Sequence, residues 1–229
     1  MSKKKSNKAE SRVEGVEQAL TKAEFFIETY QKQIIRVIGV ILVFVVAYMA
    51  FRQLYVEKKT KDASADMSPA EQYFETEDWE HALYGDGNYP GFEEIISLYR
   101  FTPQANLARY YAGVCCWRMG EYEDAISYLS KFKSKDIILS SIALGGIGDA
   151  YAQLDEPDKA ISFYKKAAER MENDFTTPLY LHRAGILLEN EGRFTESSEL
   201  FERIKRDYPN SPEGRNIDKN ISRVKVQAE

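Results

Sequence analysis

The chain has 229 residues, of which 44% are hydrophobic and 29% are charged, and its formal net charge is −5. This composition excludes a disordered, collagen-like or low-complexity chain, and the two adjacent cysteines, Cys115 and Cys116, exclude a disulfide scaffold. The charge is divided unevenly, because residues 1–61 carry a net charge of +6 and residues 62–229 a net charge of −11. The larger, acidic part repels a phosphate backbone, so we expect no nucleic-acid partner.

The basic part surrounds the most apolar segment of the chain. Fifteen uncharged residues run from Val37 to Phe51. With its apolar flanks the segment covers residues 34–54, about 31 Å as a helix, which matches a hydrocarbon core of about 30 Å. We predict a transmembrane helix at 34–54 that acts as an uncleaved signal anchor in contact with membrane lipid. The alternatives are a buried core helix and a signal peptide cleaved at Ala63-Ser64-Ala65, which lies eleven residues beyond the apolar run.

The flanks of this segment complete the expected division of the chain. Residues 1–33 form a basic segment with apolar residues spaced 3 and 4 apart, which favours an amphipathic helix on the membrane over a partner-binding coiled coil. Eight basic residues precede the uncharged run Val37 to Phe51 and four follow it in the adjoining flank, so the total favours a cytoplasmic N-terminus, although the counts close to the membrane are similar. Residues 55–68 are expected to be a juxtamembrane linker, and residues 69–229 a folded domain.

The folded domain contains an internal repeat. Gly113, Gly148 and Gly185 recur at intervals of 35 and 37 residues. Each glycine is followed by three residues at fixed offsets. An apolar residue lies three positions later, a small residue twelve positions later and a large apolar residue sixteen positions later. In repeat order these are Cys116, Tyr151 and Leu188; Ala125, Ala160 and Ser197; and Leu129, Tyr164 and Phe201.

This pattern resembles the tetratricopeptide repeat, a helix-turn-helix unit of about 34 residues. Small residues let the two helices approach where they cross, and large apolar residues fill the space around the crossing. The resemblance implies an all-α helical solenoid with about three clear repeats, one degenerate repeat in residues 68–99 and a C-terminal capping helix that begins near Ser211. In the degenerate repeat we expect Trp79 and Gly91 at the two small positions. The predicted repeat-packing residues are Gly113, Ala125, Gly148, Tyr151, Ala160, Tyr164, Gly185 and Phe201.

No segment of the sequence has a catalytic pattern. His81 and His182 have no metal-binding neighbour at helical spacing, and Gly145-Gly146-Ile147-Gly148 follows no predicted strand. We therefore expect no enzyme, no cofactor, no metal site and no small-molecule substrate.

The resemblance instead implies a binding groove lined by the first helix of each repeat. The implied groove is largely apolar and aromatic, which suits extended or helical peptides with exposed apolar side chains. Some of these residues have an alternative role in packing against the chain's own helices, and Asp149 and His182 are expected to be solvated rim residues. The predicted groove residues are Leu107, Tyr110, Val114, Trp117, Ile142, Asp149, Leu179, His182 and Ile186.

One N-terminal anchor followed by a short repeat domain is similar to the ancillary SecYEG translocon subunits of bacteria. This resemblance implies an inner-membrane protein whose repeat domain faces the periplasm and whose partners are the SecYEG translocon and a periplasmic chaperone. It further implies a chaperone-like adaptor that holds partners or unfolded clients near the translocon. Two alternatives remain open: a scaffold for assembly of a cell-envelope complex, and a cytoplasm-facing membrane receptor.

Overall fold

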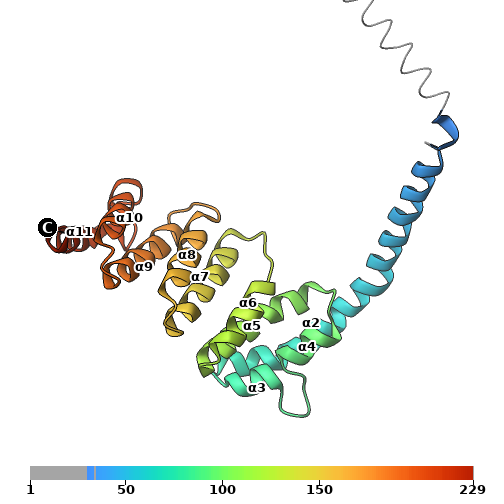
Figure 1. Cartoon of the computed structure of the whole chain (residues 1–229). Coiled ribbons are helices and arrows are strands. Elements are labelled where there is room, and N and C mark those ends of the chain that lie inside the picture. Colours follow the sequence, from blue (N-terminus) through green and yellow to red (C-terminus); the bar gives the residue numbers. More distant parts are fainter. Residues whose placement is uncertain (1–29, 34, 229) are drawn as a thin grey trace, which may run out of the picture. The chain divides into compact units, whose positions relative to one another are not determined.

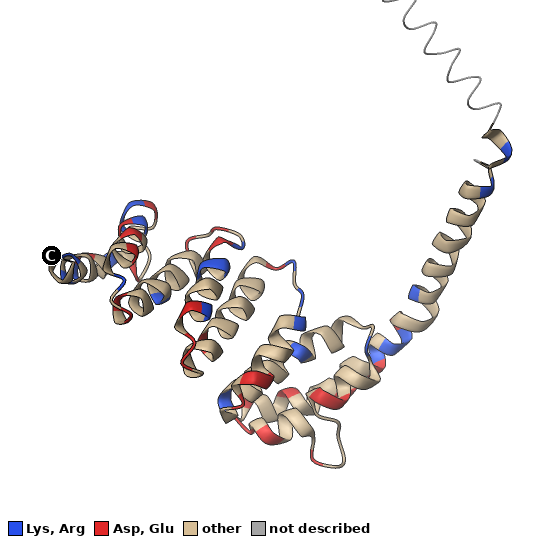
Figure 2. Ribbon diagram, in the orientation of Figure 1, with Lys and Arg blue, Asp and Glu red and all other residues tan. Residues whose placement is uncertain are grey.

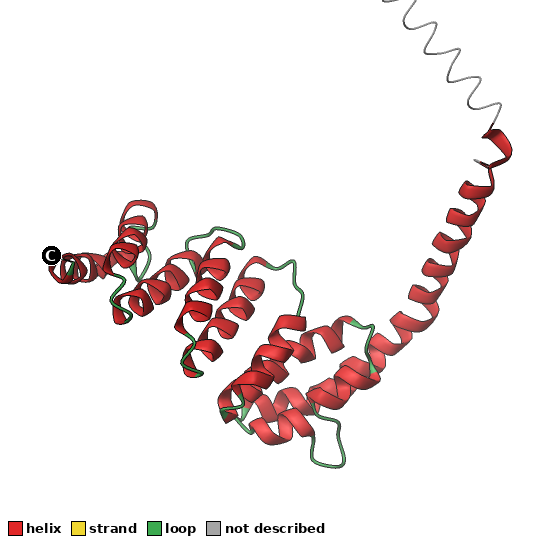
Figure 3. Ribbon diagram, viewed as in Figure 1, coloured by secondary structure: helices red, strands yellow, loops and turns green. Residues whose placement is uncertain are grey.

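The computed structural model describes residues 30–33 and 35–228, and these residues form two units that divide after Val56. The described residues are helical throughout, apart from turns, loops and one isolated bridge between Gly85 and Pro90 (Figure 3). The all-α prediction is therefore confirmed. Most of the expected amphipathic segment 1–33, and Ile34 at the start of the expected span, lie outside the described residues.

The first unit contains the apolar segment. The helical stretch Tyr30–Glu75 includes a window that is long and apolar enough to cross a membrane, and none of that window is buried. Every described residue from Ile35 to Tyr55 is exposed. This exposure argues against the alternative of a buried core helix. A short π-helical turn, η1 (Arg52–Val56), follows the apolar run.

The second unit is a solenoid of short helices in which each helix packs against its neighbours in the sequence (Figure 1). Its helices are α2 (Glu57–Glu75), α3 (Trp79–Tyr84), α4 (Phe92–Leu98), α5 (Pro103–Met119), α6 (Tyr122–Lys131), α7 (Ile137–Gln153), α8 (Pro157–Glu169), α9 (Thr176–Asn190), α10 (Phe194–Asp207), η2 (Gly214–Asn216) and α11 (Ile217–Gln227). The pairs α5–α6, α7–α8 and α9–α10 are the three clear repeats.

Within each clear repeat, a glycine of the first helix faces the large apolar residue sixteen positions later. A Cβ atom would lie 2.6 Å from Leu129 at Gly113, 2.7 Å from the Tyr164 ring at Gly148 and 2.4 Å from the Phe201 ring at Gly185. The small residue twelve positions after the glycine is fully buried in each repeat. In the third repeat this small residue is Ser197, whose hydroxyl group donates a hydrogen bond of 2.8 Å to the Gly185 carbonyl. The helix crossings therefore have the residue offsets that the sequence predicts.

The turn between the paired helices also repeats. Gly120, Asp155 and Gly192 all have left-handed φ angles, of 84°, 57° and 71°. The next residue donates its backbone N–H to the residue three positions after the repeat glycine, for example from Glu156 to the Tyr151 carbonyl at 3.0 Å. This bond satisfies a carbonyl at the end of the first helix and reverses the chain.

The same turn occurs between α2 and α3, and it sets the register of the degenerate repeat. Glu77 has a φ of 60°, and Asp78 donates to the Tyr73 carbonyl at 2.9 Å. In the clear repeats the two small residues lie seven positions before and five positions after the left-handed turn residue. The same offsets from Glu77 give Ala70 and Ala82, which are twelve residues apart and both buried. Trp79 and Gly91, which the sequence suggested for these positions, therefore do not hold them.

The structure also differs from the expected juxtamembrane linker at residues 55–68. Residues 57–68 belong to α2, and Ala63 and Met67 lie in the core cluster with Ala70. Their spacing of four and three residues places them on one helix face, so the folded unit begins about ten residues earlier than predicted. At the other end, the capping helix α11 buries Ile217, Ile221 and Val224 as expected, but it begins after Ser211, at Ile217.

We expect Gly148→Ala to destabilise the protein. The added methyl group meets the Tyr164 ring, which cannot swing away freely because its hydroxyl group is bonded to Asp149 at 2.8 Å. Overpacking should lower the unfolding free energy by about 1–2 kcal/mol despite the better helix propensity of alanine. The matched control is Gly146→Ala on the same helix, whose methyl group meets only the Leu129 Cδ1 atom at 3.1 Å. Denaturant unfolding followed by circular dichroism measures both variants, and equal stability would contradict the assigned crossing.

We expect Glu77→Gly to stabilise the protein. A glutamate is strained at a φ of 60°, whereas glycine adopts this conformation freely. The gain should be about 1 kcal/mol in the same unfolding assay. The control, Gln72→Gly in the interior of α2, should lose about 1 kcal/mol because it adds backbone freedom without relieving strain. A loss of stability in Glu77→Gly would contradict the turn.

Candidate functional site

The first helices of the three clear repeats share one pocket of about 200 Å³. Five predicted groove residues line it: Tyr110, Val114 and Trp117 from α5, and Ile142 and Asp149 from α7. The structure adds residues that sequence reasoning missed, which are Arg118, Gly146, Tyr180 and Arg183. The repeat-packing residues Gly113 and Leu129 form part of its wall. We call this cavity the groove pocket.

Aromatic rings form much of the groove pocket. Tyr110 packs on Phe132 with a centroid distance of 5.5 Å, and the Arg118 guanidinium lies 5.5 Å from the Trp117 ring centroid. Burial raises the pKa of Tyr110, and burial raises that of Tyr180 to about 12. Both phenols are therefore neutral at physiological pH. The pocket thus presents uncharged aromatic surface on two of its three helices.

The glycines of α7 make room for the rings of its neighbours. A Cβ atom at Gly145 would lie 2.0 Å from the Tyr180 ring of α9, and one at Gly146 would lie 3.1 Å from Leu129 of α6. Gly148 faces Tyr164 of α8 in the same way. The glycine-rich run therefore serves close packing on three sides, which agrees with its predicted place inside a helix.

An ion pair closes one side of the groove pocket. The Arg183 Nη1 atom of α9 lies 2.5 and 2.6 Å from the two carboxylate oxygens of Asp149 on α7. Asp149 also accepts a hydrogen bond from the Tyr164 hydroxyl group at 2.8 Å. The Arg183 guanidinium lies 5.6 Å from the Tyr180 ring centroid. Asp149 is therefore a paired structural residue at the pocket wall, whereas the sequence suggested a solvated rim residue.

Four predicted groove residues do not line this pocket. Leu107 packs on the core cluster formed by residues of α2–α6, and Leu179 and Ile186 pack on the cluster formed by residues of α8–α11. His182 is half-buried, lies 5.7 Å from the Phe201 ring centroid and has its Nε2 atom 3.3 Å from the Asn220 amide nitrogen. Desolvation lowers the pKa of His182. Leu107 and Leu179 thus have the packing contacts that the alternative role describes, whereas His182, expected to be a solvated rim residue, is half-buried against Phe201.

The missed residues have a common physical origin. Tyr180 occupies the repeat position that Ala108 and Ala143 hold in the other two repeats, and Gly145 of the preceding repeat makes space for its ring. A large residue in one repeat is thus matched by a missing side chain in the preceding repeat. A comparison of equivalent positions across neighbouring repeats could have found this pair.

The described residues include no group of three or more His, Cys, Asp or Glu side chains that could hold a metal ion. Cys115 and Cys116 are buried free thiols, and burial raises the pKa of each to about 12. They are protonated at neutral pH, which suits a packing role.

Comparison with known families agrees with this geometry. Models of the tetratricopeptide repeat match residues 92–136, 142–174 and 180–211. The chain is therefore a tetratricopeptide repeat protein, a class of generally non-enzymatic modules that bind other proteins.

A solved structure supports the fold. The crystal structure of MamA protein is 17% identical in sequence and aligns with a TM-score of 0.53 over 72% of this chain and 89% of that chain. At this identity the likeness concerns the fold alone. No curated protein gives a significant match to the sequence.

We expect Asp149→Ala to lower the unfolding free energy by about 1–3 kcal/mol, because it leaves the buried Tyr164 hydroxyl group without its acceptor. The loss should shrink in a Tyr164→Phe background, which a double-mutant cycle measures. The control is Asp158→Ala, which breaks the exposed pair with Arg193 and should change stability by at most about 1 kcal/mol. Equal losses at the two sites would show that the pocket ion pair is no more than a surface pair.

Proposed function

We propose that this protein is a membrane-anchored adaptor that binds protein partners in the groove pocket. The observation that carries the proposal is the joint lining of one apolar, aromatic cavity by α5, α7 and α9. A volume of about 200 Å³ is smaller than the roughly 300–1,000 Å³ of small-molecule sites, and it suits an apolar side chain of a peptide. Arg183 and Asp149 beside it offer a donor and an acceptor for the peptide backbone.

We further propose that residues 34–54 span the bacterial inner membrane once. The full exposure of the described apolar residues supports this, because an exposed helix of this composition is unstable in water. The excess of Lys and Arg before the span supports a cytoplasmic N-terminus and a repeat domain in the periplasm. Membrane lipid is then the environment of the anchor, and protein partners reach the groove pocket from the periplasm.

The partners that we propose are the SecYEG translocon and a periplasmic chaperone, together with unfolded clients. The shared architecture of an N-terminal anchor and a short repeat domain supports this choice. An aromatic groove also favours exposed apolar side chains, which emerging chains carry before they fold. A scaffold for envelope assembly and a cytoplasm-facing receptor use the same fold, so the partners identified by experiment decide among the three.

We expect Trp117→Ala to weaken partner binding at least about tenfold, because it removes a large aromatic contact from the pocket wall. The full-length protein is tagged, extracted from native membranes in mild detergent, and its copurified translocon subunits and chaperone are quantified by mass spectrometry. Helical content should be nearly unchanged.

The control variant is Tyr89→Ala, which removes an exposed ring from the loop between α3 and α4, outside the groove pocket. It should leave copurification unchanged. Equal recovery in the Trp117→Ala and wild-type samples would move the binding site off this surface. Recovery of one unrelated membrane complex would support the scaffold, and recovery of cytoplasmic proteins would support the receptor.

A further inference from the structure

One edge of the solenoid carries most of its exposed apolar side chains. Nine large apolar residues between positions 57 and 228 are exposed, and six of them lie in or beside the connections from one repeat to the next. These six are Leu98, Phe101, Ile137, Ile138, Met171 and Phe175. We call the surface formed by these connections and by the start of α2 the inter-repeat edge.

Hydrogen bonds link the first two connections of the inter-repeat edge to the helices beside them. Tyr99 of the α4–α5 turn bonds to Asp66 of α2, and Gln104 bonds to Ser64 at 2.8 Å. Asn106 exchanges two hydrogen bonds with the backbone of Lys133 in the next connection.

The row continues toward the C-terminal end of the solenoid. Ile137, Ile138 and Phe175 line one open apolar depression between the second and third connections. Residues 207–212 adjoin Asp174 in the same row. The second and third connections, and the third and fourth, therefore line shared depressions along this edge.

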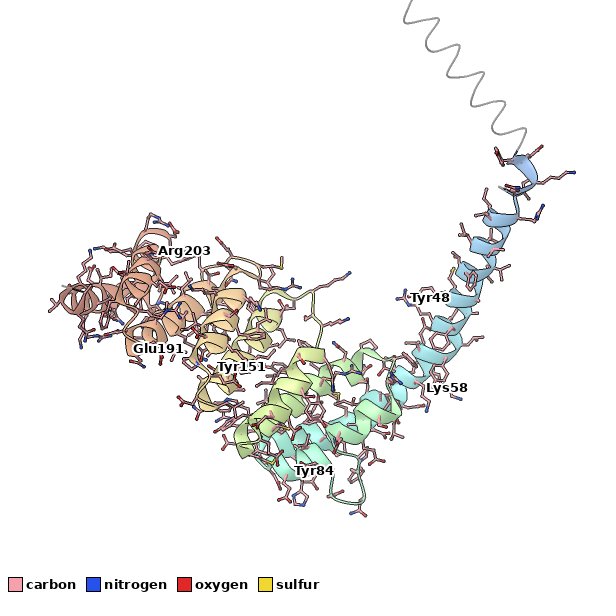
Figure 4. The ribbon with its side chains drawn as sticks, viewed as in Figure 1. Tyr48, Lys58, Tyr84, Tyr151, Glu191 and Arg203 are labelled. Atoms are coloured by element: carbon pink, nitrogen blue, oxygen red, sulfur yellow. The ribbon has the colours of Figure 1, made fainter. Side chains whose placement is uncertain are left out.

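The opposite edge, formed by the turns within repeats, is acidic (Figure 2). Residues 75–80 include four acidic side chains and no basic one, and three further turns each carry three acidic side chains and one basic one. Those turns are residues 118–124, 153–159 and 189–196. Glu191, labelled in Figure 4, lies in the last of these turns, and Tyr151, also labelled, lies in the last turn of α7 just before another.

The inter-repeat edge, in contrast, contains two clusters of lysines. Residues 131–138 carry three lysines and one aspartate, and the start of α2, residues 57–66, carries three lysines and three acidic residues with the lysines grouped at 58–61. Two connections are exceptions, because residues 170–175 carry two acidic residues and one basic one, and residues 207–212 carry one acidic residue and no basic one. Glu172 is paired with Arg203 at 2.6 Å, and Asp207 with Arg206 at 2.8 Å. An apolar edge with lysines facing one way and an acidic edge facing the other is the charge pattern of a surface that meets anionic lipid.

The chain itself reaches the folded unit at this edge. The start of α2 belongs to the inter-repeat edge, and seven residues lie between Tyr55, at the end of the apolar run, and Ala63, the first buried core residue. Even fully extended, the eight steps from Tyr55 to Ala63 reach at most about 29 Å. The chain therefore enters the folded unit at the edge that carries the exposed apolar residues.

We propose that the inter-repeat edge lies on the lipid surface, with its apolar side chains at the boundary between headgroups and acyl chains and its lysines at anionic headgroups. This proposal rests on the proposed membrane anchor. The acidic edge and its turns then face away from the bilayer. The second repeat and its connections hold the groove pocket at a fixed height above the membrane.

The test places one fluorophore at a time on the full-length protein in vesicles of phosphatidylethanolamine and phosphatidylglycerol. Ile138→Cys supplies a label site on the inter-repeat edge, and Glu123→Cys supplies a matched exposed site in the first turn of α6, at an acidic turn. The native thiols are buried and protonated, so maleimide reacts with the introduced cysteine. Lipids with a quencher near the headgroup end of the acyl chain should reduce emission about twofold at position 138, since interfacial side chains lie about 5–10 Å deep. They should not reduce it at position 123.

A second substitution tests the contact itself. Phe175→Glu should reduce the quenching at position 138, because it places a carboxylate in the proposed lipid contact, whereas Val226→Glu at the exposed end of α11 should not. Equal quenching at positions 138 and 123, or a signal at 138 that depends on the protein-to-lipid ratio as for a second copy of the chain, would overturn the proposal. Flotation of the vesicles tests the membrane anchor separately from the lipid contact of the inter-repeat edge. Protein that floats without quenching supports the anchor and contradicts the lipid contact. Protein that does not float contradicts both.

Discussion

The structure depends on the close approach of paired helices at a residue without a side chain. In each clear repeat a glycine allows a large apolar side chain of the second helix to lie against the backbone of the first. The turn that follows is tied to the same point, because the residue three positions after the glycine accepts its closing hydrogen bond. The degenerate repeat keeps the geometry with Ala70 and Ala82 in the small positions. One spacing rule therefore fixes crossing, turn and register together.

The groove pocket is a consequence of the same rule applied between repeats. Gly145 and Gly146 of α7 receive Tyr180 from one neighbour and Leu129 from the other, so three first helices approach closely enough to enclose a shared cavity. The Asp149–Arg183 pair then joins two of those helices at the pocket wall. Packing and binding surface are thus made by the same few residues, and a change in one alters the other.

The sequence predicted the repeats because their offsets depend on local helix geometry. It predicted five residues of the groove pocket for the same reason, since equivalent positions of first helices share a face. It missed Tyr180 and Arg183 because their partners lie in the preceding repeat. Gly145 of that repeat leaves space for the Tyr180 ring, and Asp149 of that repeat pairs with Arg183. The sequence of one repeat considered alone contains neither partner. It also mistook the start of α2 for a linker, since the small residues Ala63 and Ala70 give a weak apolar signal although they are buried.

The central claim is that polypeptide partners occupy the groove pocket, and crosslinking in living cells tests it most directly. A photoreactive phenylalanine analogue replaces Trp117 in one strain and Tyr89 in another, and proteins trapped on irradiation are identified. We expect adducts with translocon subunits, a periplasmic chaperone or nascent secreted chains from position 117 and none of these from position 89. Equal adducts from both positions, or none from position 117 in a stably folded protein, would contradict it.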